Sequence, residues 1–132
     1  MVNARTGSGV ARLGVIALDC PDGLELARFY SALTGWPLAA DAEWGWAELD
    51  NGGGTTIACQ GVADYRPPVW PTAEHPQQAH LDFYVEDLDV GEAAVIALGA
   101  RRHEVQPGET FRVFLDPVGH PFCLVRAGAG GS

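Results

Sequence analysis

The clearest pattern of apolar and polar positions lies near the start of the chain, where one apolar stripe recurs with helical spacing. The stripe consists of Leu26, Phe29, Tyr30 and Leu33. Intervals of three and four residues place these side chains on one face of an α-helix, which would pack on a sheet. Asp22 and Glu25 supply the acceptors that a first helical turn needs, and Gly35 can take the left-handed conformation that ends a helix.

Extended segments flank this predicted helix. Residues 13–19 form an apolar run ahead of it, which is typical of a strand. Further strands are expected after it, near residues 36–40, 44–49 and 55–62. The glycines at 52–54 permit the positive φ of a tight connection. The first half of the chain therefore predicts a βαβββ unit.

The same arrangement recurs 65 residues further along the chain. This offset aligns four identical pairs, namely Asp22 with Asp87, Ala32 with Ala97, Leu33 with Leu98 and Gly54 with Gly119. It also aligns the predicted elements, which in the second half are a strand at 79–85, a helix at 89–98 and strands near 100–105, 111–115 and 121–126. Self-similarity at a fixed offset indicates a duplicated structural unit. We therefore predict an α+β fold built from two tandem βαβββ modules.

The two modules fit a single domain. The expected divisions are a flexible N-terminus at 1–10, module one at 11–64, a linker at 65–77, module two at 78–126 and a flexible C-terminus at 127–132. The linker contains Pro67, Pro68, Pro71 and Pro76. Proline lacks the N–H group that a strand donates, so this segment is expected to form a linker or a lid rather than a strand.

Charge and cysteine content narrow the possible partners. The 132 residues include 8 basic and 17 acidic side chains and carry a net charge of −9, which repels nucleic-acid phosphates and anionic membrane surfaces. No apolar stretch approaches the roughly 18 residues of a membrane span, and the start lacks a signal-peptide core. Cys20, Cys59 and Cys123 are widely spaced, which is typical of buried thiols in a reducing compartment. We predict a cytoplasmic protein without nucleic-acid or membrane partners.

The end of module two is the most distinctive sequence, running FLDPVGHPFCLV over residues 114–125. Together with Phe29-Tyr30, Thr34-Gly35 and the two βαβββ units, it resembles the vicinal oxygen chelate superfamily of glyoxalases, bleomycin-resistance proteins and ring-cleaving dioxygenases. The chain is most similar to small glyoxalase-like proteins of actinobacteria. The resemblance covers about residues 11–126 and implies a homodimer and a half-open, eight-stranded sheet around a cavity, with helices outside.

Metal-dependent members of this superfamily bind a divalent ion through the first and last strands of each module. The matching positions are Val15, Ala58, His80 and Cys123. Val15 and Ala58 have no lone pair to offer, and Cys123 replaces the usual glutamate with a soft thiol. Strand alternation places Gln60 and Asp82 on the same faces, so both could join His80 and Cys123 in an alternative site. Because glutamine is a weak ligand and module one would supply no charge, we expect no metal and no other cofactor.

The remaining chemistry favours a small-molecule site. Asp82 can orient His80 as a hydrogen-bonding group or a general base. The chain has four tryptophans, whose rigid rings suit flat organic molecules, and Trp70 in the linker is a candidate lid residue. The residues expected to contact a ligand are His80, Asp82, Gln60, Trp46 and Cys123.

Three functions remain open from the sequence. The leading hypothesis is a small-molecule binder with a degenerate metal site and an aromatic cavity, acting by drug sequestration of the bleomycin-resistance kind. The second is a lyase or isomerase acting on a small oxygenated metabolite, with His80 as base or metal ligand. The third is a scaffold or regulatory module whose cavity has filled with side chains. No other catalytic motif is present, so no residue is assigned as catalytic.

Overall fold

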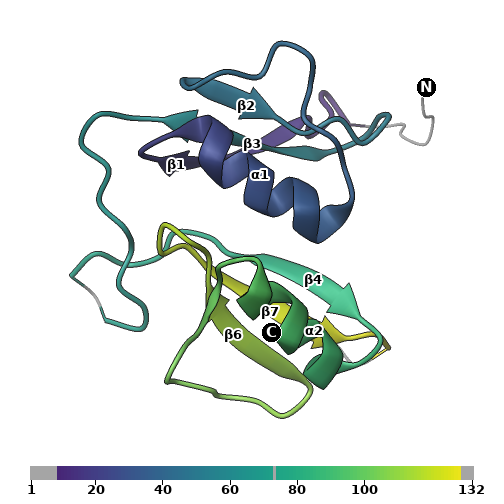
Figure 1. Cartoon of the computed structure of the whole chain (residues 1–132), viewed down its shortest axis with the longest axis vertical. Coiled ribbons are helices and arrows are strands. Elements are labelled where there is room, and N and C mark those ends of the chain that lie inside the picture. The colour runs from purple at the N-terminus through teal and green to yellow at the C-terminus, as the bar shows by residue number, and fades with distance from the viewer. Residues whose placement is uncertain (1–8, 73, 129–132) are drawn as a thin grey trace.

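The computed structural model describes residues 9–72 and 74–128 as two modules of similar build (Figure 1). Module one contains β1 (Val15–Cys20), α1 (Gly23–Thr34), β2 (Trp46–Glu48) and β3 (Thr56–Gly61). Module two contains β4 (Leu81–Val85), α2 (Leu88–Ala97), β5 (Arg101–Arg102), β6 (Phe111–Leu115) and β7 (Pro121–Arg126). The predicted α+β class is confirmed. The expected flexible ends lie almost entirely outside the described residues.

The equivalent strands of the two sheets have the same order and the same register. In both modules the first strand runs parallel to the last, and Ile16 opposite Ile57 in module one corresponds to Leu81 opposite Phe122 in module two. Each of these residues is matched by one 65 positions later in the chain. Residues that lie 65 positions apart in the sequence therefore occupy equivalent positions in the two sheets.

The sheets differ from the expected eight-stranded arrangement. The described residues form a three-stranded sheet, β1-β3-β2, and a four-stranded sheet, β4-β7-β6-β5. The segment expected as a strand at 36–40 makes a single bridge between Leu38 and Leu49. Pro37 accepts a hydrogen bond from the N–H of Asp50 at 2.8 Å but has no N–H to return, which limits the ladder at this edge.

Both helices begin after an aspartate: α1 after Asp22, as the sequence predicted, and α2 after Asp87, slightly ahead of the predicted start at residue 89. The side chain of Asp22 accepts from the N–H of Leu24 at 3.0 Å, and that of Asp87 accepts from two N–H groups in the first turn of α2. Helix α1 ends at Gly35, whose φ of 81° is left-handed. The residues that identified the helices thus also determine where they begin and where the first one ends.

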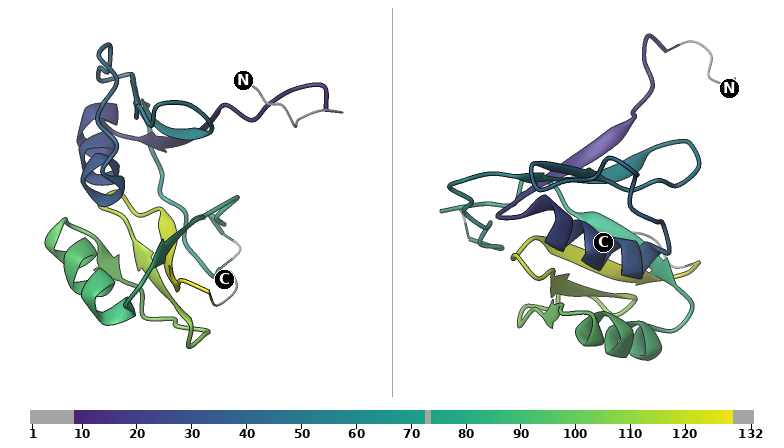
Figure 2. Two further views of the ribbon diagram at one scale, coloured as in Figure 1. Left: turned by 90° about the vertical axis from the view of Figure 1, so that its right-hand side faces the viewer. Right: turned by 45° about the horizontal axis from the view of Figure 1, so that its top comes forward.

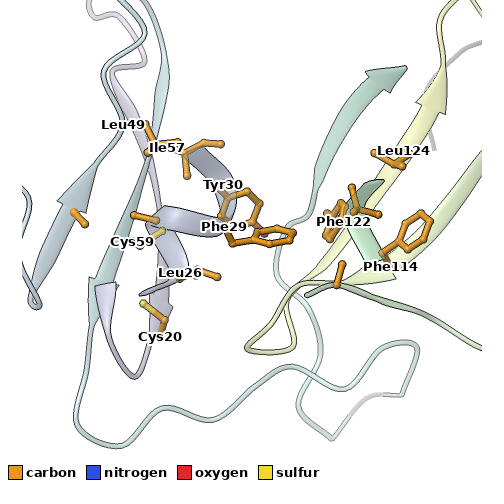
Figure 3. Close-up of a cluster of buried hydrophobic side chains, with 14 of the residues drawn as sticks. Cys20, Leu26, Phe29, Tyr30, Leu49, Ile57, Cys59, Phe114, Phe122 and Leu124 are labelled. Carbon is orange, nitrogen blue, oxygen red and sulfur yellow. The ribbon is translucent and has the colours of Figure 1, made fainter. Parts of the chain in front are cut away.

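The main core lies where α1 of module one meets the sheet of module two. Figure 3 shows Phe29 and Tyr30 of α1 pointing toward Phe122, and their ring centroids lie 5.9 and 6.4 Å from that of Phe122. The hydroxyl of Tyr30 donates to the buried carboxylate of Asp116 at 2.6 Å. Asp116 also accepts from two backbone N–H groups of its own turn. A continuous core and a buried hydrogen bond therefore join the two modules.

This core leaves one face of each sheet without a helix on it. In the left view of Figure 2, α1 and α2 lie along one side of the molecule and the linker between the modules lies along the other. We call the sheet faces that point away from the helices the outer faces, and the faces that pack against the helices and the main core the inner faces.

Within the described residues, neither helix is long and apolar enough to cross a membrane.

Candidate functional site

Strand alternation separates the core residues of module two from the residues of its outer face. On β4, Leu81, Phe83 and Val85 pack against the main core. His80 and Asp82 therefore lie on the opposite face. On β7, Phe122 belongs to the core and Cys123 belongs to a second buried cluster. The outer face of module two thus carries residues from two paired strands, with Asp82 directly opposite Cys123 in the register.

Three side chains of this face form a compact polar cluster of His80, Asp82 and Cys123. The Nε2 atom of His80 lies 3.2 Å from Oδ1 of Asp82. One potential ligand atom from each residue lies within 4.8 Å of the other two. The side chains of His80 and Asp82 are 32% and 26% exposed, whereas Cys123 is only 4% exposed. The cluster is therefore accessible from its His80–Asp82 side and closed beneath Cys123.

The cluster lies beside a pocket of about 200 Å³ between the linker and the outer face of module two. Its walls are Trp70, Gln77, His80, Pro107, Phe111, Val113, Pro121 and Cys123. The linker residue Trp70 packs against the buried cluster that contains Cys123, and its ring centroid lies 5.0 Å from that of His103. Trp70, the candidate lid residue, therefore forms a wall of the pocket that is held by packing.

Gln77 is a pocket residue that the sequence did not single out. Its Oε1 atom is buried and has no hydrogen-bond partner among the described residues. A buried acceptor without a donor is unfavourable, so a bound molecule or water that donates to this atom would be stabilised. The only sequence signal was the position of Gln77 in the linker, just before β4.

The structure does not bring all five expected ligand contacts into this pocket. His80, Asp82 and Cys123 come together, but Gln60 and Trp46 pair with each other on β3 and β2 of the other sheet. The indole N–H of Trp46 donates to Glu48 at 3.3 Å. Neither Gln60 nor Trp46 lines the pocket of module two. Alternation places Gln60 and Trp46 on the outer face of their own sheet, but they line no part of the pocket beside His80.

The other two cysteines differ from Cys123 in their surroundings. Cys20 and Cys59 lie in the main core, and burial raises the pKa of the Cys20 thiol from 9.0 to about 11. Burial also raises the pKa of Cys59 well above its ordinary value. Both thiols stay protonated at neutral pH and act as small apolar side chains. Cys123 is the cysteine that lines the pocket.

Comparison with known proteins agrees with this architecture. The Glyoxalase-like domain family matches residues 15–125. The chain belongs to this family. Among curated proteins, none matches the chain.

Solved structures show the same fold at low sequence identity. A glyoxalase/bleomycin resistance protein/dioxygenase family enzyme from Burkholderia phytofirmans PsJN has a TM-score of 0.66 at 18% identity, covering 88% of this chain and 98% of that one. A glyoxalase-related enzyme from Fulvimarina pelagi has a TM-score of 0.62 at 22% identity, covering 93% and 96%. The fosfomycin resistance protein FosX from Listeria monocytogenes has a TM-score of 0.61 at 15% identity, covering 91% and 93%. Together with the family match, these structures support the conclusion that this glyoxalase-like domain has the fold of the vicinal oxygen chelate superfamily.

A metal site drawn from both modules does not fit this glyoxalase-like domain. The module-one positions implied by the superfamily are Val15 and Ala58, and neither side chain has a donor atom. The 65-residue offset pairs the cluster of His80, Asp82 and Cys123 with Val15, Ala17 and Ala58. The described donor cluster is therefore confined to module two and combines nitrogen, oxygen and sulfur.

Proposed function

We propose that this protein binds a small organic molecule in the pocket of module two. The observation that carries the proposal is the combination of apolar walls, including Trp70 and Phe111, with a polar cluster at one side. Binding sites for small molecules combine apolar surfaces, which supply affinity, with a few polar groups, which fix orientation. Here His80 and Asp82 supply the polar groups, and the orphaned Oε1 of Gln77 supplies an acceptor.

The pocket and the charge of the chain limit the ligand. A volume of about 200 Å³ is smaller than the roughly 300–1,000 Å³ of sites that enclose drug-sized molecules. The ligand is therefore a small metabolite, or a larger molecule that leaves part of itself in solvent. The net charge of −9 favours neutral or cationic molecules. Sequestration of such a compound, as in bleomycin resistance, is the cellular role we propose.

A lyase or isomerase activity on a small oxygenated metabolite is the second candidate. The observation that favours it is the 3.2 Å separation between His80 and Asp82. A carboxylate at this distance fixes the orientation of the imidazole ring, as a general base requires. A scaffold whose cavity has filled is less favoured, because the pocket beside this pair has open volume.

A screen for ligands that raise the melting temperature tests the binding proposal, because a molecule that binds only the folded state must stabilise it. We expect at least one small aromatic or oxygenated metabolite to raise the melting temperature of the full chain. Trp70→Ala should abolish the shift, whereas Trp46→Ala, on the other sheet, should leave it unchanged. Equal losses in both variants, or no stabilising compound in a broad panel, would argue against a site confined to module two.

The homodimer expected from the resemblance is a further part of this proposal. Trp44 and Trp46 of module one are 52% and 36% exposed, which leaves large apolar rings in solvent in a single copy. We propose that a second copy of the chain covers them. Light scattering should give twice the monomer mass, and Trp46→Arg should lower it. A monomer mass at high concentration would contradict this.

A further inference from the structure

We propose that the ligand of this protein is an aromatic amine, whose ring occupies the pocket of module two and whose ammonium group donates a hydrogen bond to Oε1 of Gln77. This inference rests on the proposed function, because it names the class of molecule that the same pocket selects. The observation behind it is the position of Gln77, which lines the pocket of module two and also a second, larger pocket beside the linker.

The second pocket, which we call the linker pocket, has a volume of about 470 Å³. One of its walls is fixed by hydrogen bonds between distant parts of the chain. Nε2 of His120 lies 2.6 Å from the backbone oxygen of Asp19 and 3.3 Å from the hydroxyl of Tyr65. These contacts join the end of β1, the linker and a turn of module two. The linker pocket is lined by residues 17–19, 64–68 and 75–79, together with Val62 and His120.

Gln77 stands where the two pockets meet, because it lines both of them. Its Oε1 atom is buried and accepts no hydrogen bond within the part of the chain that the structure describes. A ligand that donates to this atom at the junction removes the cost of a buried, unpaired acceptor. A charged donor forms a hydrogen bond roughly twice as strong as a neutral one. The junction therefore favours an ammonium group over a hydroxyl group.

The charges of the linker pocket favour the same group. Its described walls carry the carboxylates of Asp19 and Asp64 and the guanidinium of Arg66, so acidic side chains outnumber basic ones. The net charge of −9 adds to the negative potential. All three side chains belong to exposed residues, so a cation beside them keeps part of its hydration and avoids the full cost of burying a charge.

The pocket of module two favours the other end of the molecule. Trp70 and Phe111 are among its walls and offer aromatic surface to a flat ring. An aromatic ring on a short chain that ends in an ammonium group matches this arrangement, because its apolar end meets apolar walls while its charge stays at the open, acidic junction. An aromatic acid would place a negative charge beside Asp64 and is disfavoured.

The test compares three indoles that share one ring and one chain length, using equilibrium dialysis of the full chain. 3-Ethylindole ends in a methyl group, tryptophol in a hydroxyl group and tryptamine in an ammonium group. Tryptamine should bind at least about tenfold more tightly than 3-ethylindole, with tryptophol between them. Gln77→Leu should remove the advantage of tryptophol and most of that of tryptamine, while the affinity for 3-ethylindole stays unchanged.

Matched variants separate the acceptor from the surrounding charge. Gln60→Leu, on the outer face of module one, lines neither pocket and should keep the full order of affinities. Asp64→Asn should weaken tryptamine binding about twofold to threefold, and Arg66→Gln should strengthen it by a similar factor, as expected for exposed charges. Glu43→Gln is the charge-matched control, because Glu43 is exposed and lines neither pocket. Circular dichroism checks that each variant folds.

Three results would overturn the inference: equal binding of the three indoles, binding of tryptophol as tight as that of tryptamine, or an unchanged preference in Gln77→Leu. In each case, binding of 3-ethylindole that is lost in Trp70→Ala would still support the proposed function. If none of the three indoles binds, the inference is also overturned, and the broader panel of compounds then tests the proposed function separately.

Discussion

The outer faces of the two modules occupy equivalent positions in the fold but differ in chemistry. The parallel pairing of first and last strands has the same register in both sheets. One face nevertheless presents Val15, Ala17 and Ala58 where the other presents His80, Asp82 and Cys123. The inner faces keep their apolar character because they must pack against the helices. Residues on the outer faces are free of that requirement. The duplicated backbone is therefore maintained by the inner residues, while the site depends on outer residues of one copy.

The largest effect should come from the inner face of module two. Phe122 is fully buried and contacts the rings of Phe29 and Tyr30 from module one. Phe122→Ala should lower the free energy of unfolding by about 4 kcal/mol, because it leaves a cavity where the two modules meet. Urea unfolding measures this loss. A loss below about 1 kcal/mol would show that the modules do not share a core.

A smaller effect should come from the polar link between the modules. Tyr30→Phe removes the hydroxyl that donates to the buried Asp116 at 2.6 Å and leaves a carboxylate oxygen short of a donor. We expect a loss of about 2 kcal/mol in the free energy of unfolding. The matched control is Tyr65→Phe, which removes a hydroxyl that donates to Val118 in the same turn. Equal losses in the two variants would contradict a special role for the buried carboxylate.

Alkaline pH should reveal the buried thiols of module one. The pKa of Cys20 is raised from 9.0 to about 11 by burial, so the folded state favours the protonated thiol. Its contribution to stability is complete below pH 9 and is lost as the pH rises toward 11, because only the unfolded chain ionises readily. Chemical unfolding between pH 8 and about 10.5 should show this fall, and Cys20→Ala should lessen it. An unchanged slope in Cys20→Ala would mean that Cys20 is not buried in solution.

The smallest effect on stability should come from the outer face of module two. His80 is partly exposed and lies outside the main core. His80→Ala should change the free energy of unfolding of the metal-free protein by no more than about 0.5 kcal/mol. A chelator-treated sample and urea unfolding provide the measurement. A loss above about 2 kcal/mol would identify His80 as a structural residue rather than a site residue.

The sequence predicted the features that depend on local pattern. The stripe of Leu26, Phe29, Tyr30 and Leu33, the aspartate caps and the 65-residue offset were sufficient to predict both helices and the duplicated register. They depend on periodicity and on hydrogen bonding within a few residues. The strand expected at 36–40 forms only one bridge. Pro37 has no N–H group to donate to a longer ladder.

Features that depend on how the modules face each other were not predictable in the same way. Alternation along β3 and β2 placed Gln60 and Trp46 on an outer face, but it could not indicate that the pocket beside His80 would be lined by module two and the linker alone. The role of Gln77 depends on the path of a linker that has no regular hydrogen-bond pattern. Both results depend on contacts between residues far apart in the sequence, which local pattern does not encode.

The central claim is that the chemistry of this protein lies on the outer face of module two. Two-dimensional NMR of the full chain during titration with a compound that raises its melting temperature tests it most directly, because each backbone amide reports on its own surroundings. The account predicts that the signals of His80, Asp82 and Cys123 shift and saturate at one equivalent, while those of Val15, Ala17 and Ala58 stay in place. Comparable shifts on both outer faces, or none on module two, would contradict it.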